Sequence, residues 1–171
     1  MSAVAGTADP RFRRVRDELE RNFADRGEVG AAVAVIVDGR TVVDLWGGLA
    51  DRERGIPWER DTIAMVHSST KGATAICAHL LAARSTIDLD DRVADHWPEF
   101  AEAGKEAIPV RWLLDHQAGL PAIAEKLPSE AALDWDTMTR ALAAQPPWWE
   151  PGTAHGYHAI TFGWLVGEVV R

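Results

Sequence analysis

The spacing of hydrophobic residues predicts a helix followed by a strand hairpin in residues 9–66. After Asp9-Pro10, a typical helix start, apolar residues recur every three or four positions, as on one helix face: Phe12, Val15, Leu19 and Phe23. Residues 31–37 are apolar on both faces, so we expect the sheet to be covered on each side. Residues 41–46 form the return strand after Asp38-Gly39, a dipeptide typical of tight hairpin turns.

From residue 67 onward the pattern is helical. Four runs are expected to form helices: residues 71–84, 110–116, 133–144 and 160–170. The first is apolar on nearly every side, which predicts a helix buried in the core. The whole pattern predicts an α+β fold in one domain spanning residues 1–171. Its parts are an N-terminal helix and sheet hairpin in residues 9–66 and a mainly helical part in residues 67–171.

Composition narrows the possible partners and the compartment. A net charge of −8 over 171 residues argues against nucleic acid and anionic membrane surfaces. The single cysteine, Cys77, excludes an internal disulfide, and its apolar neighbours predict a core thiol. Residues 1–10 contain no apolar signal-peptide core, and no run approaches the roughly 18 apolar residues of a membrane span. We therefore expect a cytoplasmic protein without a membrane span.

The main candidate for chemistry is Ser68-Ser69-Thr70-Lys71, at the start of the first predicted helix. Residues three apart share one helix face, so the Ser68 hydroxyl and the Lys71 amine can touch. A serine needs an adjacent base to become a nucleophile, and burial or positive potential can lower a lysine pKa enough to supply one. The alternative is structural: such a tetrapeptide arises roughly once by chance in a chain of this length, and Ser68 could simply be a helix N-cap.

Other candidates carry weaker signals. His155 and His158 are three residues apart, but without acidic or cysteine neighbours this spacing is more typical of surface or core histidines than of a metal site. His116 follows a short predicted helix, where a histidine favours the negative end of the helix dipole. The sequence contains none of the nucleotide-binding, zinc-protease or G-x-S-x-G motifs. We expect neither a cofactor nor a metal.

Several stretches, in the same order, resemble serine β-lactamases and penicillin-binding proteins, in particular the class C β-lactamases and family VIII carboxylesterases. The S-x-x-K element is Ser68 to Lys71. Residues 113–121 resemble the family's L-L-x-H-x-x-G-L-P segment, and Pro151-Gly152-Thr153 followed by Tyr157 resembles its P-G-T-x-x-x-Y segment. The Trp46-Gly47-Gly48 end of the hairpin resembles its N-terminal strands. The resemblance implies a β-lactamase/transpeptidase-like fold, with an antiparallel hairpin flanked by helices and a mainly helical subdomain.

The resemblance also implies roles for three residues. Ser68 would be the acylated nucleophile, Lys71 would hold or relay its proton, and Tyr157 would be the partner base. The Lys71 charge would lower the phenol pKa of Tyr157 from its usual value near 10. The Ser68 N–H would be one oxyanion donor. The implied activity is hydrolysis of a small ester or amide through an acyl-enzyme, without a cofactor.

Two departures from the family pattern shape the expected function. Where the family often has Y-x-N, this chain has Tyr157-His158-Ala159, and the missing Asn favours a carboxylesterase over a β-lactamase or D-Ala-D-Ala peptidase. Family members are also longer, and nothing here matches their C-terminal K-T-G-like element. We therefore expect the N-terminal half of such an enzyme, incomplete at its C-terminus. The alternative is an inactive truncated homologue that binds a partner through an unpaired sheet edge.

Overall fold

The computed structural model describes residues 4–171, and the chain divides into two compact units, Met1–Met65 and Val66–Arg171. We call them the sheet unit and the helical unit. Each has a hydrophobic cluster of its own. The single-domain organisation of residues 1–171 stays a prediction.

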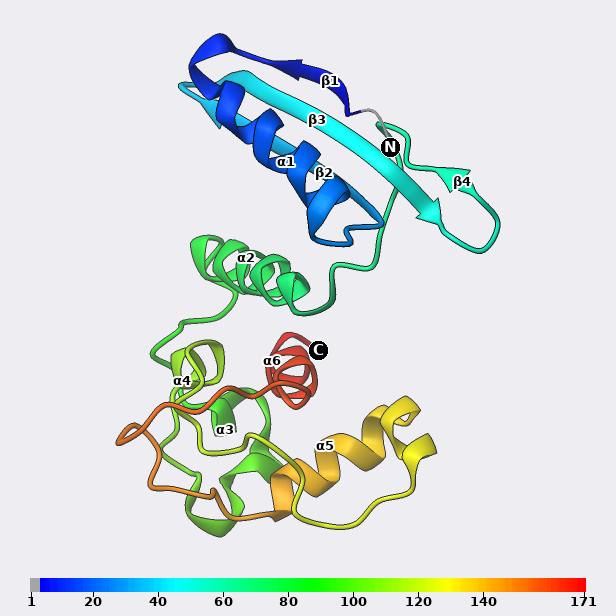
Figure 1. The fold of residues 1–171 in the computed structure, drawn as a ribbon. Helices are drawn as coiled ribbons and strands as arrows, with labels where there is room; N and C mark the ends of the chain where they lie inside the picture. Colours follow the sequence, from blue (N-terminus) through cyan, green and yellow to red (C-terminus); the bar gives the residue numbers. More distant parts are fainter. Residues whose placement is uncertain (1–3) are drawn as a thin grey trace. The chain divides into compact units, whose positions relative to one another are not determined.

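The sheet unit is an antiparallel sheet with a helix packed on it (Figure 1). Strands β1 (Ala5–Ala8), β2 (Gly30–Val37) and β3 (Arg40–Asp51) lie in the order β1-β3-β2, and β4 (Ile56–Pro57) pairs with the end of β3. The 3-10 turn η1 (Pro10–Phe12) leads into helix α1 (Arg13–Asp25). Leu19 of α1 is buried with Val43 and Leu45 of β3, which fixes the helix against the central strand.

The predicted hairpin is confirmed as β2 and β3. Its turn residues Asp38 and Gly39 have φ angles of 49° and 74°, both in the left-handed region that a type I′ turn requires. The helix start is also confirmed, since the Asp9 carboxylate accepts the backbone N–H of Arg11 at 2.9 Å. Strand β1 was not predicted, because its four small or polar residues show no hydrophobic alternation.

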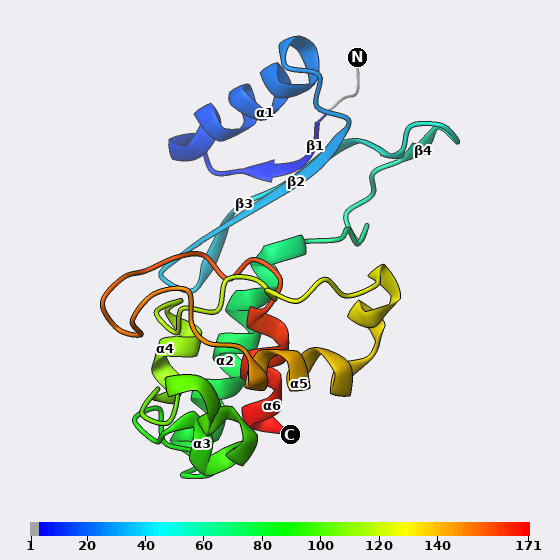
Figure 2. The ribbon, with the colours of Figure 1, turned by 90° about the horizontal axis from the view of Figure 1, so that it is seen from below.

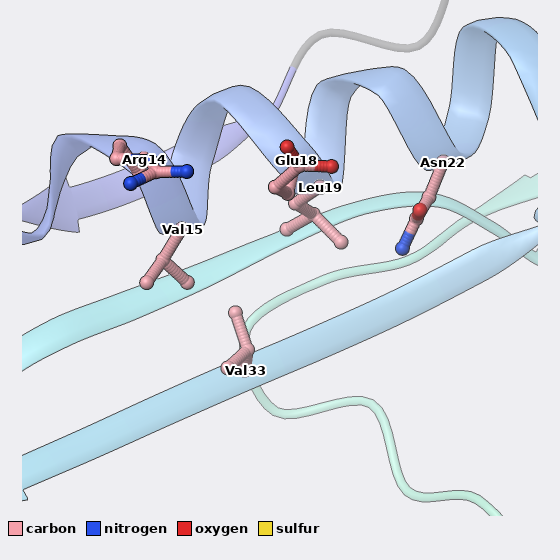
Figure 3. Close-up of a pocket in the computed structure, with 6 residues that line it drawn as sticks. All are labelled: Arg14, Val15, Glu18, Leu19, Asn22 and Val33. Carbon is pink, nitrogen blue, oxygen red and sulfur yellow. The ribbon is translucent and has the colours of Figure 1, made fainter.

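The expectation that residues 31–37 are covered on both faces is wrong for the described part of the chain. No side chain of β2 is fully buried, and Ile36 is 65% exposed. Where α1 passes over the strand, a groove of about 410 Å³ stays open (Figure 3), lined by Arg14, Val15, Glu18, Leu19, Asn22 and Val33. An apolar sequence makes burial of the strand favourable, but whether the strand is buried depends on which other segments pack on it.

The helical unit consists of short helices joined by long loops (Figure 1). In chain order its elements are η2 (His67–Ser69), α2 (Thr70–Ala83), α3 (Val93–His96), η3 (Pro98–Gly104), α4 (Val110–Leu114), η4 (Ser129–Leu133), α5 (Trp135–Ala144) and α6 (Phe162–Val170). The last helix contacts α2, α4 and α5 (Figure 2), and it buries four apolar side chains: Phe162, Leu165, Val166 and Val169. The C-terminal apolar run is therefore the centre of this unit's core.

Two expectations for the helix over residues 71–84 are wrong in this structure. Helix α2 buries only Ala78, while Ile76 and Leu80 are 63% and 50% exposed. Cys77 is exposed, so it is not a core thiol. Helix α6 contacts α2, and the part of the chain that the structure describes leaves other apolar positions of α2 uncovered. Sequence shows which faces of a helix tolerate burial, whereas packing decides which of them are buried.

Candidate active site

The candidate site begins where the chain turns into helix α2. His67 has a φ angle of 45°, which is uncommon for a residue with a Cβ and redirects the backbone just before Ser68. Ser68 lies inside the 3-10 turn η2, and the residue at the N-cap of α2 is Ser69, whose side chain makes no capping bond. The alternative interpretation of Ser68 as the N-cap of this helix is therefore wrong.

The Lys71 ammonium lies at the centre of the polar contacts. Its Nζ donates to Ser68 Oγ at 3.1 Å and to the backbone oxygen of Ala159 at 2.7 Å. The same nitrogen lies 4.9 Å from the centre of the Tyr157 ring. The contact with Ser68 joins residues three apart at the start of the helix, whereas the contacts with Ala159 and Tyr157 join Lys71 to residues far along the chain.

Tyr157 completes the group from the loop between α5 and α6. Its side chain is half exposed. Hydrogen bonding with Ser68 is the largest cause that lowers the Tyr157 pKa, followed by hydrogen bonding with Lys71, while burial opposes the shift. Lys71, one of the three residues singled out by the resemblance, thus contacts the other two, Ser68 and Tyr157, within the helical unit. A lowered phenol pKa raises the fraction of the tyrosine that is phenolate, and so able to accept a proton, near neutral pH.

The loop that carries Tyr157 is bonded to the segment after α4. His116 contributes its backbone oxygen, which accepts the Gly156 N–H at 3.2 Å, and its Nδ1, which accepts the His158 N–H at 3.2 Å. The His116 ring also lies edge-on to the Tyr157 ring, with centroids 5.0 Å apart. His116 therefore braces this loop from the place expected from the sequence, directly after the C-cap of α4.

Sequence reasoning missed one functional group and gave only a weak signal for another. The Ala159 carbonyl contacts Lys71, but a backbone oxygen has no residue-type signal. His158 is fully buried, although its spacing from His155 had raised only a weak metal signal. Within residues 4–171, no group of three His, Cys, Asp or Glu side chains is arranged to hold a metal ion. The groove in Figure 3 contains none of the predicted site residues.

The fold is that of the serine β-lactamase and penicillin-binding-protein class. The family described as Beta-lactamase matches residues 16–171, and the chain belongs to this family. Two solved structures share its fold over 99% of this chain: a family VIII carboxylesterase, with 47% identity and a TM-score of 0.91, and a penicillin-binding protein homologue from Caulobacter crescentus, with 43% identity and a TM-score of 0.94. The predicted β-lactamase/transpeptidase-like fold is thereby confirmed.

Curated relatives include hydrolases of this family. The chain is 43% identical over 168 residues to "Esterase/beta-lactamase LipL" of Mycobacterium tuberculosis (strain ATCC 25618 / H37Rv), and 30% identical over 156 residues to "Esterase EstB" of Burkholderia gladioli. These alignments cover 98% and 81% of this chain, but only 39% and 40% of the relatives. The two solved structures are covered to 46%. The chain therefore spans less than half the length of these relatives.

None of the helices in residues 4–171 combines the length and the apolar character that crossing a bilayer requires.

Proposed function

We propose that this chain carries the acylating residues of a serine hydrolase that cleaves small carboxylic esters. Ser68 is the nucleophile, Tyr157 is the general base, and Lys71 is the cation that stabilises the phenolate of Tyr157. The observation that carries the proposal is the placement of one ammonium group, 3.1 Å from the Ser68 hydroxyl and 4.9 Å from the Tyr157 ring. The Ala159 carbonyl orients that ammonium, since Lys71 donates to it at 2.7 Å.

The proposed reaction has two acyl-transfer steps. Tyr157, as phenolate, accepts the Ser68 proton while Oγ attacks the ester carbonyl, and the Ser68 N–H donates to the developing oxyanion. The alcohol leaves with the proton from Tyr157, which leaves an acyl group on Ser68. Water then gives a proton to Tyr157 and attacks the acyl carbon. Tyr157 returns that proton to Ser68 Oγ as the acid leaves, which restores Ser68 and the phenolate. The ammonium of Lys71 stabilises the phenolate in both steps.

The test of this mechanism is labelling and turnover in the full-length protein. Ser68→Ala should lower kcat by on the order of 10³ or more and abolish labelling by a fluorophosphonate. Ser69→Ala is the matched control, because Ser69 is the adjacent residue and its side chain makes no capping bond. A Ser68→Ala variant with near wild-type turnover, or a fluorophosphonate adduct on another residue, would refute the assignment.

The preference for esters over β-lactams rests on Ala159 and on the relatives. Ala159 presents only its backbone oxygen to the site, through Lys71, and has no side-chain amide to hold a lactam substituent. Two of these relatives are described as an esterase/β-lactamase and a family VIII carboxylesterase. We expect kcat/KM for p-nitrophenyl butyrate to exceed that for a chromogenic cephalosporin. A larger value for the cephalosporin would favour the alternative, β-lactamase or D-Ala-D-Ala peptidase activity.

A second candidate is a binding or interaction module without catalysis. The observation that favours it is the edge of β2, which pairs only with β3 among the described strands and can accept another strand. If Ser68 is neither labelled nor required for turnover, this candidate replaces the hydrolase. A cytoplasmic location and the absence of nucleic-acid partners stay predictions of the sequence.

A further inference from the structure

We infer that His158 is a positioning residue for Tyr157: a neutral imidazole that ties the backbone on either side of the tyrosine to the Gly119-Leu120 segment. This inference rests on the proposed function, because it assigns a role in the placement of the general base. The neighbouring tyrosine side chain is half exposed, so packing alone does not fix its position. Its placement therefore depends on how the two adjacent residues are held.

The ring of His158 is fully buried and uses both nitrogens. Nε2 accepts the backbone N–H of Leu120 at 2.9 Å. Nδ1 lies 2.6 Å from the backbone oxygen of Gly156, which can only accept, so Nδ1 carries the proton. These partners assign one tautomer, with Nδ1 protonated and Nε2 free. A second proton on Nε2 would face the Leu120 N–H, and two donors cannot share that bond.

The loop that carries Tyr157 is bonded to residues 116–120 at three further points. The backbone N–H groups of Gly156 and His158 donate to the oxygen and Nδ1 of His116, each at 3.2 Å. The Thr161 hydroxyl donates to the oxygen of Leu120 at 2.6 Å. Leu120 is thus bonded through its N–H to His158 and through its oxygen to Thr161. Residues 156–161, which include Tyr157 and the Ala159 carbonyl, are held as one piece between these bonds.

The surroundings of the ring favour its neutral form. The His116 ring stacks on it with centroids 5.4 Å apart, and the Trp149 ring meets it edge-on at 5.9 Å. Burial is the main cause that lowers the pKa of His158; charges on His116 and His155 add to it, while the Gly156 carbonyl and Asp115 oppose it. The folded-state pKa therefore lies below 6.5, the ordinary value. The contribution of this ring to the stability of the folded protein is therefore complete above about pH 6.5, and it is lost as the pH falls through the folded-state pKa.

Two substitutions in the full-length protein separate the positioning role from simple filling of the core. His158→Gln keeps an oxygen that can accept the Leu120 N–H but cannot be protonated, whereas His158→Leu fills the space without an acceptor. We expect His158→Leu to lower kcat about tenfold or more while KM changes less than about threefold, because the base moves and the binding groups do not. His158→Gln should retain kcat within about threefold. His79→Gln, at an exposed histidine of α2, is the control.

The pH profile supplies a readout that a purely structural residue would not move. We expect kcat to fall on the acid side as His158 gains its second proton in wild type, and this fall to be weaker in His158→Gln, since the glutamine does not titrate. The profile is followed down to the lowest pH at which both proteins stay folded. A folded His158→Leu variant with wild-type kcat would overturn the inference. If His158→Leu does not fold, equal acid limbs in wild type and His158→Gln would overturn it. If Ser68→Ala keeps its turnover, both the proposed function and this inference are refuted. If Ser68→Ala is inactive but the His158 variants behave as wild type, only this inference is refuted.

Discussion

The hydroxyl of Thr161 offers a sharp test of the packing around the candidate site. Thr161 is 2% exposed, and its Oγ1 donates to the backbone oxygen of Leu120 at 2.6 Å. Thr161→Val keeps the β-branched shape and removes only the donor, so the Leu120 oxygen stays buried without that bond. A buried acceptor left unsatisfied costs about 1–3 kcal/mol. We expect a loss of that size in the free energy of unfolding.

A matched control exists in the same unit. The Thr153 hydroxyl donates to the backbone oxygen of Glu150, also at 2.6 Å, but this bond is exposed. Water can replace the lost donor there, so Thr153→Val should cost less than about 0.5 kcal/mol. Both variants have the same change of atoms and the same bond length. They differ in burial, and the Glu150 oxygen also keeps the Thr153 N–H as a donor at 3.1 Å.

The assay is equilibrium urea unfolding of the full-length protein, followed by tryptophan fluorescence. The eight tryptophans of this sequence provide the signal. The difference between the two variants should be about 1–2 kcal/mol, with unchanged dependence on urea concentration. Equal losses in the two variants would refute the reasoning, since they would mean that the Leu120 oxygen finds another donor or reaches water.

Three further outcomes follow from the same structure. Tyr157→Phe should lower kcat about 10²-fold or more with little change in KM, measured on p-nitrophenyl butyrate, and wild-type kcat would exclude it as the base. Lys105 is fully buried and donates to three backbone carbonyls, so Lys105→Met should destabilise the protein by about 2 kcal/mol or more, against almost no effect of Met at the exposed Lys126. Burial lowers the pKa of Lys105 from its ordinary value of 10.5 to about 8. As pH rises from about 8 to about 10.5, the folded chain has lost this proton while the unfolded chain still binds it, so the free energy of unfolding of the wild type should rise with pH. The Lys105→Met variant should show no such rise. A polypeptide of residues 1–171 alone should bind a hydrophobic dye and self-associate through the free edge of β2, and a monodisperse monomer with Ser68-dependent turnover would contradict this expectation.

Local features of this protein are determined by short stretches of sequence. Asp38 and Gly39 adopt left-handed backbone angles and form the hairpin turn predicted from the dipeptide. Apolar residues at three- and four-residue spacing form α1, and Leu19 on that face is buried. The Ser68–Lys71 contact belongs to this group as well, because residues three apart at a helix start are neighbours by geometry alone. In each case residues close together in the sequence form the feature, although the burial of Leu19 also needs strand β3.

The rest of the candidate site depends on contacts between distant parts of the chain. Lys71 meets the Ala159 oxygen across 88 positions, and Leu120 meets the His158 ring across 38. Residue types suggested neither bond: the first acceptor is a backbone oxygen, and the second partner is a backbone N–H. The exposure of Ile76 and Cys77 on α2 was likewise unpredicted, because burial depends on which other segments cover a face. Sequence therefore determined the turns, the helix faces and the pair at the start of α2, whereas only the folded chain could bring a tyrosine, a carbonyl and a buried histidine to that pair.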